Sequence, residues 1–172
     1  MLAIVDYGMG NIRSVKNAFE LLGEKTILTK DKKQLSESDA IILPGVGAFE
    51  DGMKNLRKEN LIDFLTETIV DKKKPYLGIC LGLEFLAEKS FENGEHDGLG
   101  WIKGEIKKII PNDPSLKIPH MGWDDTEILS SKGILSEMND VSFYYLHSYY
   151  FKVDKNEKEF VTSICDYGGV PI

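Results

Sequence analysis

The chain of 172 residues is predicted to form an α/β fold, with a central, mostly parallel sheet and helices on both faces. Two observations predict this fold. Continuous apolar runs, which are typical of strands buried on both faces, occur at residues 2–5, 40–43 and 76–79. Patterns with helical spacing lie between these runs, at residues 12–22, 51–57 and 61–70. Strands that alternate with helices form parallel sheets, in which function sits at the carboxyl ends of the strands.

The first strand, residues 2–5, leads through a turn with two glycines into a helix over residues 12–22. Asn11 is a suitable N-cap for this helix, and Gly23 is suited to end it. One face of the helix carries the apolar residues Val15, Ala18, Phe19 and Leu22. The turn also suits a phosphate-binding loop, but two glycines without a third favour a structural turn or a partner-facing loop.

Residues 25–29 are predicted to form the second strand, and the polar residues 31–39 contain a short helical turn. The third strand, residues 40–43, runs directly into Pro44-Gly45-Val46-Gly47-Ala48-Phe49. Because glycines flank Val46 on both sides, the backbone there can expose an N–H group without a side chain in the way.

The apolar run from residue 76 ends in Gly78-Ile79-Cys80-Leu81-Gly82, and a helix is predicted over residues 81–89. A strand, a sharp turn and a helix form a nucleophile elbow, here with Cys in place of Ser. Gly78 and Gly82 remove a collision between positions on either side of the turn. The helix dipole favours the Cys80 thiolate, and the free N–H of Leu81 can donate to an oxyanion. The alternative is that Cys80 is a buried thiol of the core.

The pattern changes after residue 89. Residues 90–100 are predicted to be a polar surface loop, and β segments are predicted at residues 101–110, 141–153 and 160–165. Residues 118–124 are predicted to form a loop in which Met121 and Trp123 flank a glycine, at the core or at a partner surface. Cys165 has no flanking glycines and is predicted to lie in the core.

Composition excludes several functional classes. The net charge of −7 argues against general attraction to nucleic acid or to an anionic membrane. Two cysteines without a Cys-x-x-Cys pattern argue against a disulfide framework or a zinc site, and they are compatible with a reducing cytoplasm. The N-terminal apolar run is too short for a signal peptide, and no later stretch is long enough to span a bilayer.

Three segments occur together at plausible spacing: Pro44-Gly45-Val46-Gly47-Ala48-Phe49, Gly78-Ile79-Cys80-Leu81-Gly82 and Pro119-His120-Met121-Gly122-Trp123. They closely resemble segments of the glutaminase subunits of imidazole glycerol phosphate synthase, which are class I glutamine amidotransferases of histidine biosynthesis. Asp6-Tyr7-Gly8-Met9-Gly10-Asn11 and His147-Ser148-Tyr149 also fit, so the resemblance covers nearly the whole chain. It implies a three-layer, flavodoxin-like fold in one domain, residues 1–172, with an added β-rich portion after residue 100.

The resemblance also implies a mechanism. The Cys80 thiolate would attack the side-chain amide carbon of glutamine, while the N–H groups of the Gly45–Val46–Gly47 backbone and of Leu81 hold the oxyanion. Ammonia would leave, and water would hydrolyse the thioester to glutamate. No cofactor or metal is implied.

The partner implied is a (β/α)8-barrel cyclase, which uses the ammonia to make imidazole glycerol phosphate and an aminoimidazole carboxamide ribonucleotide. The resemblance places five residues at the glutamine substrate: Glu84, Glu92, His147, Ser148 and Tyr149. It places five more at the interface of a heterodimer with the cyclase: Gly10, Asn11, Met121, Trp123 and Asp124.

The sequence departs from the family pattern in three ways. Glu84 stands where the family usually has Gln, and its carboxylate would repel the substrate carboxylate and raise the pKa of Cys80. Asp124 stands where the family usually has Asn. The His and Glu that activate the cysteine come from an H-P-E segment that these 172 residues do not contain. The domain is therefore expected to be incomplete at its C-terminus, and the 172 residues alone are expected to be inactive.

None of the three histidines is expected to replace the missing base. His96 is predicted to be solvated, and His120 to belong to the interface loop. Three alternative functions remain open. The chain could be a non-catalytic partner of the cyclase, a paralogue that feeds ammonia to another synthase such as one that aminates a sugar nucleotide, or a flavodoxin-like nucleotide binder.

Overall fold

The computed structural model describes residues 1–138 and 141–172, and its main sheet has four parallel strands in the order β2-β1-β3-β4. These are β1 (Leu2–Val5), β2 (Thr26–Thr29), β3 (Ala40–Gly45) and β4 (Tyr76–Cys80). All four predicted strands of the first half are therefore confirmed. β3 and β4 are neighbours, and their register places Gly45 directly beside Cys80. The glycine loop and the cysteine thus end at the same edge of the sheet, as the sequence predicts.

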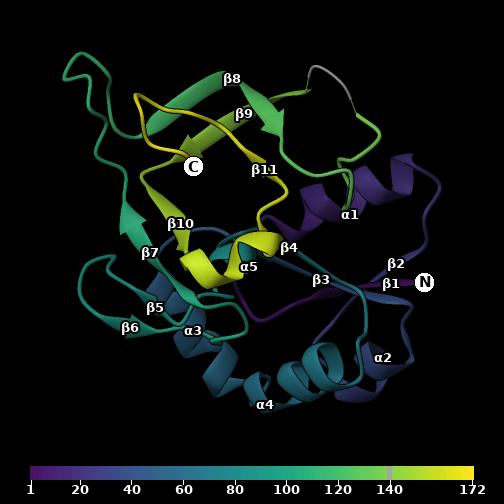
Figure 1. Cartoon of the computed structure of the whole chain (residues 1–172). Coiled ribbons are helices and arrows are strands. Elements are labelled where there is room, and N and C mark those ends of the chain that lie inside the picture. Colours follow the sequence, from purple (N-terminus) through teal and green to yellow (C-terminus); the bar gives the residue numbers. More distant parts are fainter. Residues whose placement is uncertain (139–140) are drawn as a thin grey trace.

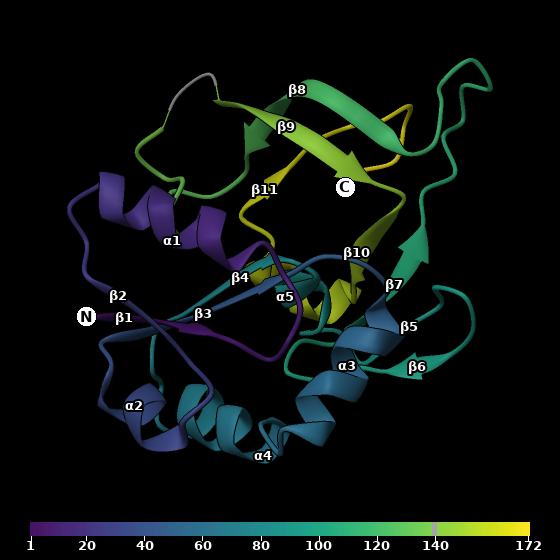
Figure 2. The same cartoon turned by 180° about the vertical axis from the view of Figure 1, so that it is seen from behind.

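Helices lie on both faces of this sheet, which confirms the three-layer arrangement (Figures 1 and 2). One face carries α1 (Ile12–Leu21), whose N-cap Asn11 accepts a hydrogen bond from the N–H of Ser14. The other face carries α2 (Lys32–Glu37), α3 (Phe49–Lys58), α4 (Ile62–Leu65) and the π-helical turn η1 (Thr66–Asp71). The core is densest on that second face, where Phe49, Met53, Leu56, Leu65 and Phe85 are fully buried.

Two smaller sheets follow in the second half. The first has the order β10-β7-β5-β6, formed by β5 (Lys89–Ser90), β6 (His96–Asp97), β7 (Gly104–Lys108) and β10 (Tyr149–Val153). The second has the order β11-β8-β9, formed by β8 (His120–Ile128), β9 (Val141–His147) and β11 (Ser163–Ile164). A 3-10 helix, η2 (Lys155–Phe160), connects β10 to β11. The predicted β-rich portion after residue 100 is confirmed.

The helix predicted over residues 81–89 is wrong in length, because α5 spans only Leu81–Glu84. The carbonyl groups of residues 85–88 accept hydrogen bonds from loop residues, so they are not free to accept hydrogen bonds within a longer helix. The N–H of Leu99 donates to the carbonyl of Phe85, and the N–H of Ile102 donates to that of Leu86. The N–H of Gly100 donates to the carbonyl of Ala87, and the N–H of Gly98 donates to that of Glu88. A second backbone segment therefore ends the helix after one turn.

Three other predictions in the second half are corrected. The predicted loop at residues 118–124 is largely strand, because β8 pairs with β9 from His120 onward. The strand predicted at residues 160–165 is shorter in the structure, where β11 spans only Ser163–Ile164 and Phe160 is the last residue of η2. His96 is not a solvated loop residue but lies half-buried in β6. Across the described residues, no helix is long and apolar enough to cross a membrane.

Candidate active site

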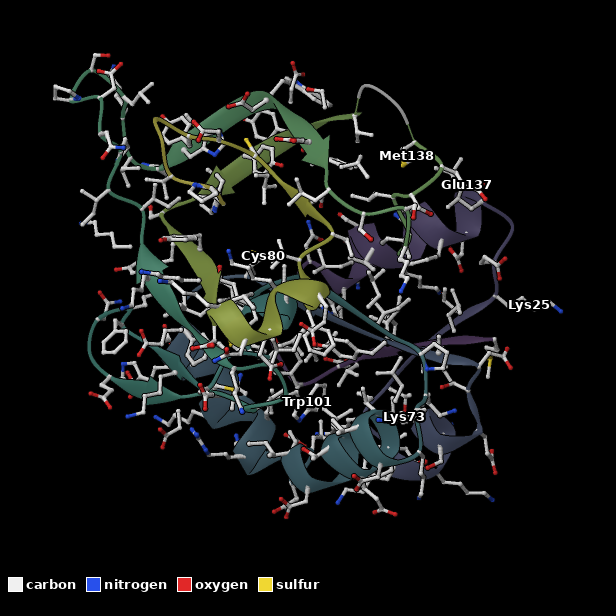
Figure 3. The ribbon with its side chains drawn as sticks, in the orientation of Figure 1. Lys25, Lys73, Cys80, Trp101, Glu137 and Met138 are labelled. Carbon is white, nitrogen blue, oxygen red and sulfur yellow. The ribbon has the colours of Figure 1, made fainter. Side chains whose placement is uncertain are left out.

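Cys80 is the last residue of β4 and immediately precedes α5, and Figure 3 labels it at this junction. Its backbone is left-handed, with φ 55° and ψ −116°, a conformation that a residue with a side chain adopts only when the surrounding structure enforces it. The residue is exposed. The elbow predicted from the sequence is confirmed, and the alternative of a buried core thiol is wrong.

Three glycines allow the backbone to turn this sharply. A Cβ atom on Gly78 would lie 2.5 Å from the carbonyl oxygen of Gly82, which confirms the predicted collision across the turn. A Cβ atom on Gly82 would lie 1.8 Å from the carbonyl oxygen of Leu43. The lack of a side chain at Gly82 therefore allows the elbow to pack directly against β3. A Cβ atom on Gly45 would lie 2.5 Å from that of Leu81. The elbow and the end of β3 are therefore in backbone contact.

One backbone N–H group reaches the thiol, and the glycine loop lies at the end of the neighbouring strand. The N–H of Leu81 donates toward Cys80 and acts to lower the pKa of its thiol. On the neighbouring strand, Gly45 lies beside Cys80, Val46 is half exposed, and Gly47 has a φ of +99° that favours glycine. These are the groups that the sequence assigns to an oxyanion hole, and the fold brings the two strand ends together.

Glu92 fixes the segment that follows the glycine loop. Helix α3 begins at Phe49, and its N-cap residue, Ala48, has no side-chain hydrogen bond. The carboxylate of Glu92 instead accepts the N–H of Phe49 at 2.7 Å, from a residue far away in the chain. This hydrogen bond caps α3 from outside and anchors the loop. The sequence places Glu92 at the substrate, and this capping role is one that the sequence does not reveal.

Two tyrosines that the sequence analysis does not single out hold the same backbone. The hydroxyl of Tyr7 donates to the carbonyl of Pro44 at 2.9 Å, and that of Tyr76 donates to the carbonyl of Gly82 at 2.5 Å. Burial raises the pKa of both hydroxyls well above the ordinary value, so they remain donors across the working pH range. They tie the glycine loop and the elbow to the sheet.

Carboxylates dominate the electrostatics of the site. Burial raises the pKa of Glu84 to about 7, and the charge of Glu92 adds to this effect. The pKa of Cys80 is also raised, first by partial desolvation and then by the charges of Glu84 and Glu92. The lowered pKa that the sequence predicts for Cys80 is wrong, because desolvation and the charges of two carboxylates outweigh the N–H of Leu81 at the start of the short helix α5.

This arrangement makes a prediction for Glu84→Gln. At about pH 8 the native Glu84 is charged and disfavours the thiolate, so the substitution should lower the pKa of Cys80. Because one pKa unit changes the thiolate fraction about tenfold, we expect the rate of iodoacetamide modification at Cys80 to rise by about three- to tenfold. At about pH 5.5 the native Glu84 is neutral, and the two rates should agree. An equal gain at both pH values would contradict this electrostatic explanation.

The histidines lie elsewhere in the fold. His147 Nδ1 hydrogen-bonds to the carbonyl of Tyr149 at 2.8 Å, and its Nε2 lies 3.0 Å from Nδ1 of His120. Burial lowers the pKa of His147. His120 is buried rather than placed in an exposed interface loop. Among the residues that the structure describes, no hydrogen bond joins Cys80 to any of the three histidines. The structure thus brings Glu84 and Glu92 near the cysteine, whereas no hydrogen bond within the described part of the chain joins Cys80 to His147, Ser148 or Tyr149.

Exposed apolar side chains form a patch on the outer face of β8 and β9. Met121 and Trp123 are 63% and 74% exposed, and their cross-strand partners Leu146 and Tyr144 are 61% and 55% exposed. The rings of Trp123 and Tyr144 pack edge to face at 5.9 Å. Asp124 points to the opposite face of β8, toward His120. Sequence patterns do not identify Tyr144 and Leu146, because only the register of β8 and β9 shows that they share this face with Trp123.

The predicted partner loop contacts the glycine loop. Gly10 has a φ of +104°, and a Cβ atom there would lie 3.3 Å from the carbonyl oxygen of Pro44. Asn11, next to it, is exposed. A partner protein that binds Gly10 and Asn11 would therefore contact a loop that packs directly against the segment of the proposed oxyanion hole.

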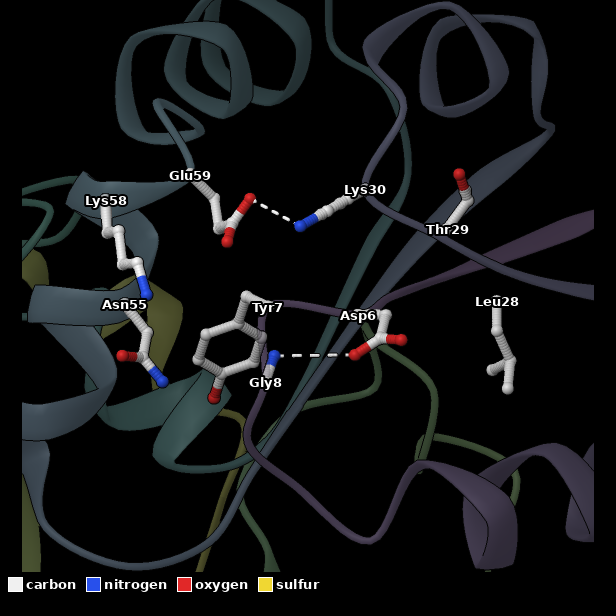
Figure 4. A pocket seen from close by; sticks show the side chains of 9 residues that line it. All are labelled: Asp6, Tyr7, Gly8, Leu28, Thr29, Lys30, Asn55, Lys58 and Glu59. Atoms are coloured by element: carbon white, nitrogen blue, oxygen red, sulfur yellow. Dashed lines mark hydrogen bonds and ion pairs between the residues drawn. The ribbon is translucent and has the colours of Figure 1, made fainter.

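A pocket of about 400 Å³ lies at the carboxyl ends of β1 and β2 (Figure 4). Tyr7 and Asp6 line it, and Lys30 forms an ion pair with Glu59 at 2.8 Å across it. None of the residues that the sequence assigns to glutamine lines this pocket. Cys80 does not line it either, so this pocket is separate from the candidate active site.

Comparisons with known proteins agree with this geometry. The family described as "Glutamine amidotransferase class-I" matches residues 3–171. The chain is 43% identical over 169 residues to imidazole glycerol phosphate synthase subunit HisH 1 of Campylobacter jejuni, covering 98% of this chain and 82% of that protein. It is 44% identical over 167 residues to subunit HisH of Aquifex aeolicus, covering 96% and 78%.

Solved structures share the fold. A crystal structure of a glutamine amidotransferase has a TM-score of 0.72 at 19% identity, covering 99% of this chain and 82% of that one. A glutamine amidotransferase from Thermotoga maritima has a TM-score of 0.57 at 19% identity, covering 90% and 63%. At this identity the likeness concerns the arrangement of helices and strands.

Proposed function

The chain belongs to the class I glutamine amidotransferases and, within them, to the HisH subunits of imidazole glycerol phosphate synthase, and we propose that Cys80 is its nucleophile. A subunit of this family is the glutaminase that supplies ammonia for the synthesis of imidazole glycerol phosphate in the histidine pathway. The observation that carries the proposal is the exposed cysteine in a left-handed elbow, directly beside Gly45 at the end of the neighbouring strand β3.

The chemistry follows from this arrangement. The Cys80 sulfur forms a bond to the side-chain carbonyl carbon of glutamine, and the carbonyl oxygen becomes an oxyanion that the N–H groups of Leu81 and of the Val46–Gly47 segment hold. The C–N bond breaks, and the nitrogen leaves as ammonia once it has gained a proton. Water then attacks the thioester, the S–C bond breaks, and glutamate is released. One oxyanion donor in such a reaction contributes about 3–4 kcal/mol.

Glu84 is proposed to accept a hydrogen bond from the substrate ammonium. Its raised pKa means that this interaction strengthens as the carboxyl ionises above about pH 7. His147, Ser148 and Tyr149 are proposed to contribute to the same substrate pocket on the strength of the family resemblance. Glu92 is proposed to act on the substrate through the loop that it anchors at Phe49.

Histidine-independent growth tests the function. The gene, expressed in its natural reading frame together with the cyclase subunit, should restore growth without histidine to a strain that lacks its own glutaminase subunit. The Cys80→Ala version should not. Failure of the native gene to restore growth, with both proteins present, would favour a subunit that serves another synthase.

We further propose that the 172 residues, as one domain without the H-P-E segment, have little or no glutaminase activity, even with the cyclase present. His120 and His147 hydrogen-bond to each other, and among the described residues no histidine hydrogen-bonds to Cys80. General acid–base help in such reactions contributes about 10²–10⁴-fold. Glutamate release by the 172-residue chain with cyclase should therefore be lower by about this factor than release by the Aquifex aeolicus subunit with its own cyclase. Equal turnover would show that a base within these residues activates Cys80.

The cyclase partner is proposed to be a (β/α)8 barrel that covers Met121 and Trp123 on the β8–β9 patch and the loop at Gly10 and Asn11. Trp123 is large, aromatic and 74% exposed, which are the properties of an interface anchor. Asp124 faces the other side of β8, so its side chain is outside this contact surface.

Trp123→Ala tests this interface. Loss of a central aromatic anchor costs about 2 kcal/mol or more, so the dissociation constant for the cyclase should rise by about 30-fold. Ile110→Ala is a matched control, because Ile110 is equally exposed at 74% but lies outside the patch. Titration calorimetry with the cyclase measures both. Equal affinity for the Trp123→Ala and native proteins would place the interface elsewhere.

A further inference from the structure

A second cluster of reactive side chains lies on the inner face of the small sheet, apart from Cys80. His120 and Asp124 are four residues apart on β8 and point to the same side, opposite Trp123. Cys165 follows β11, which pairs with β8, and its backbone is fixed by two hydrogen bonds with Ile172 of 2.8 Å each. One nitrogen, one oxygen and one sulfur atom of these three side chains lie within 4.8 Å of one another.

A chain of hydrogen bonds determines which nitrogen of His120 carries its proton. The carbonyl oxygen of Tyr149 can only accept, so Nδ1 of His147 carries the proton that it donates there. Nε2 of a neutral His147 then has no proton and accepts a hydrogen bond from Nδ1 of His120 at 3.0 Å. The remaining nitrogen of His120, Nε2, presents a lone pair to the cluster.

This lone pair faces two other side chains whose atoms can ligate a metal ion. Nε2 of His120 lies 3.4 Å from Oδ2 of Asp124, and the Cys165 sulfur completes the group. His120 is 3% exposed and Cys165 1% exposed, so water cannot solvate either one fully. The Cys165 thiol hydrogen-bonds to the side chains of Asp124 and Tyr145, so a metal ion that binds here would take the place of the thiol proton.

The surroundings hold His120 firmly in this orientation. The rings of Tyr145 and Tyr167 stack on its two sides, with centroids 4.8 Å and 4.0 Å away. His147 supplies the hydrogen bond to the ring nitrogen that is not directed into the cluster, an arrangement that metal-ligating histidines almost always have. Asp124 is half-buried, which leaves a path from solvent to the cluster on its side.

We propose that His120, Asp124 and Cys165 bind a divalent transition-metal ion of the Zn²⁺ class, with water as a fourth ligand on the Asp124 side. Imidazole, thiolate and a single carboxylate suit Zn²⁺ or Co²⁺, whereas Mg²⁺ and Ca²⁺ prefer sites made of oxygen atoms alone. The site ties β8 to the segment after β11. The absence of a Cys-x-x-Cys pair predicts no zinc site, but these ligands come from separate segments that spacing cannot connect.

Cobalt absorption tests the proposal. The untagged chain is freed of metal with a chelator and titrated with Co²⁺, and the near-ultraviolet band of a cobalt–thiolate bond is followed. We expect saturation at one ion per chain and displacement by Zn²⁺. Cys80→Ser is the matched control and should retain the band, while Cys165→Ser should lose it. The proposal would be overturned if the native chain showed no cobalt–thiolate band, or if the band persisted in Cys165→Ser. A shared proton between His120 and Asp124 would then explain their close approach.

A second variant covers the case in which Cys165→Ser does not fold. Asp124→Asn keeps the shape of the side chain and removes its charge, so its far-ultraviolet circular dichroism without metal should match that of the native chain. Its affinity for Co²⁺ should fall by about tenfold or more, and Zn²⁺ should raise its melting temperature less than that of the native chain. Native affinity in Asp124→Asn would exclude Asp124 as a ligand and overturn the site as proposed.

Discussion

Iodoacetamide is expected to modify one cysteine per chain, and that cysteine is Cys80. The two thiols differ in their exposure to solvent, which controls access by the reagent. Cys80 is exposed, whereas Cys165 is 1% exposed, and burial together with the charge of Asp124 raises the pKa of Cys165 to about 11. A glutamine-analogue electrophile should modify Cys80 as well, because the analogue places its reactive carbon where the amide carbon of glutamine would lie.

Cys80→Ala should abolish both modifications. In the protein made from its natural gene and assembled with the cyclase, it should also lower the rate of glutamine hydrolysis by about 10⁴-fold or more, since no thioester can form. Intact mass and peptide mapping locate the modified residue, and glutamate release measures the rate. Cys165→Ser is the control and should still be modified at position 80. Failure of the glutamine analogue to react at Cys80, while iodoacetamide does, would argue for a surface thiol without a glutamine site.

The elbow and the main sheet are predictable because their determinants are local. Short apolar runs identify β1, β3 and β4, and the glycines around Cys80 identify the turn. The catalytic hypothesis also depended on local features, since Gly45 and Cys80 each end an apolar run. Parallel strands end at the same edge of a sheet, and the pairing of β3 with β4 then places Gly45 beside Cys80.

The features that sequence patterns do not predict depend on contacts between distant segments. Helix α5 ends early because loop residues such as Leu99 take its carbonyl groups, and no pattern within residues 81–89 shows this. The pKa of Cys80 is raised by partial burial and by Glu92, whose position near the elbow depends on the fold. The side chains of His120 and Cys165 meet only because β11 pairs with β8.

Gly82→Ala is expected to destabilise the whole domain, although the substitution favours helix formation. Gly82 lies in α5, where Ala is better than Gly by about 1 kcal/mol in helix propensity. The new Cβ atom would lie 1.8 Å from the carbonyl oxygen of Leu43, which is backbone of a central strand and cannot rotate away. Overpacking of this kind costs about 3 kcal/mol, so we expect the free energy of unfolding to fall by a net of about 2 kcal/mol or more. Urea unfolding followed by circular dichroism measures this change.

A second readout connects this clash to function. To relieve the overlap, α5 must move away from β3, which separates Cys80 and Leu81 from Gly45 and widens the proposed oxyanion hole. Any folded Gly82→Ala protein should therefore also lose reactivity toward the glutamine analogue while it keeps reactivity toward iodoacetamide. Gly23→Ala is the control, since nothing lies within 4 Å of its Cβ position and only the φ of +83° opposes it, at about 1–2 kcal/mol. Gly23→Ala should lower the free energy of unfolding but leave the reactivity of Cys80 toward both reagents unchanged. If Gly82→Ala had the same free energy of unfolding and the same reactivity toward the glutamine analogue as the native chain, the site would not depend on close contact between the elbow and β3.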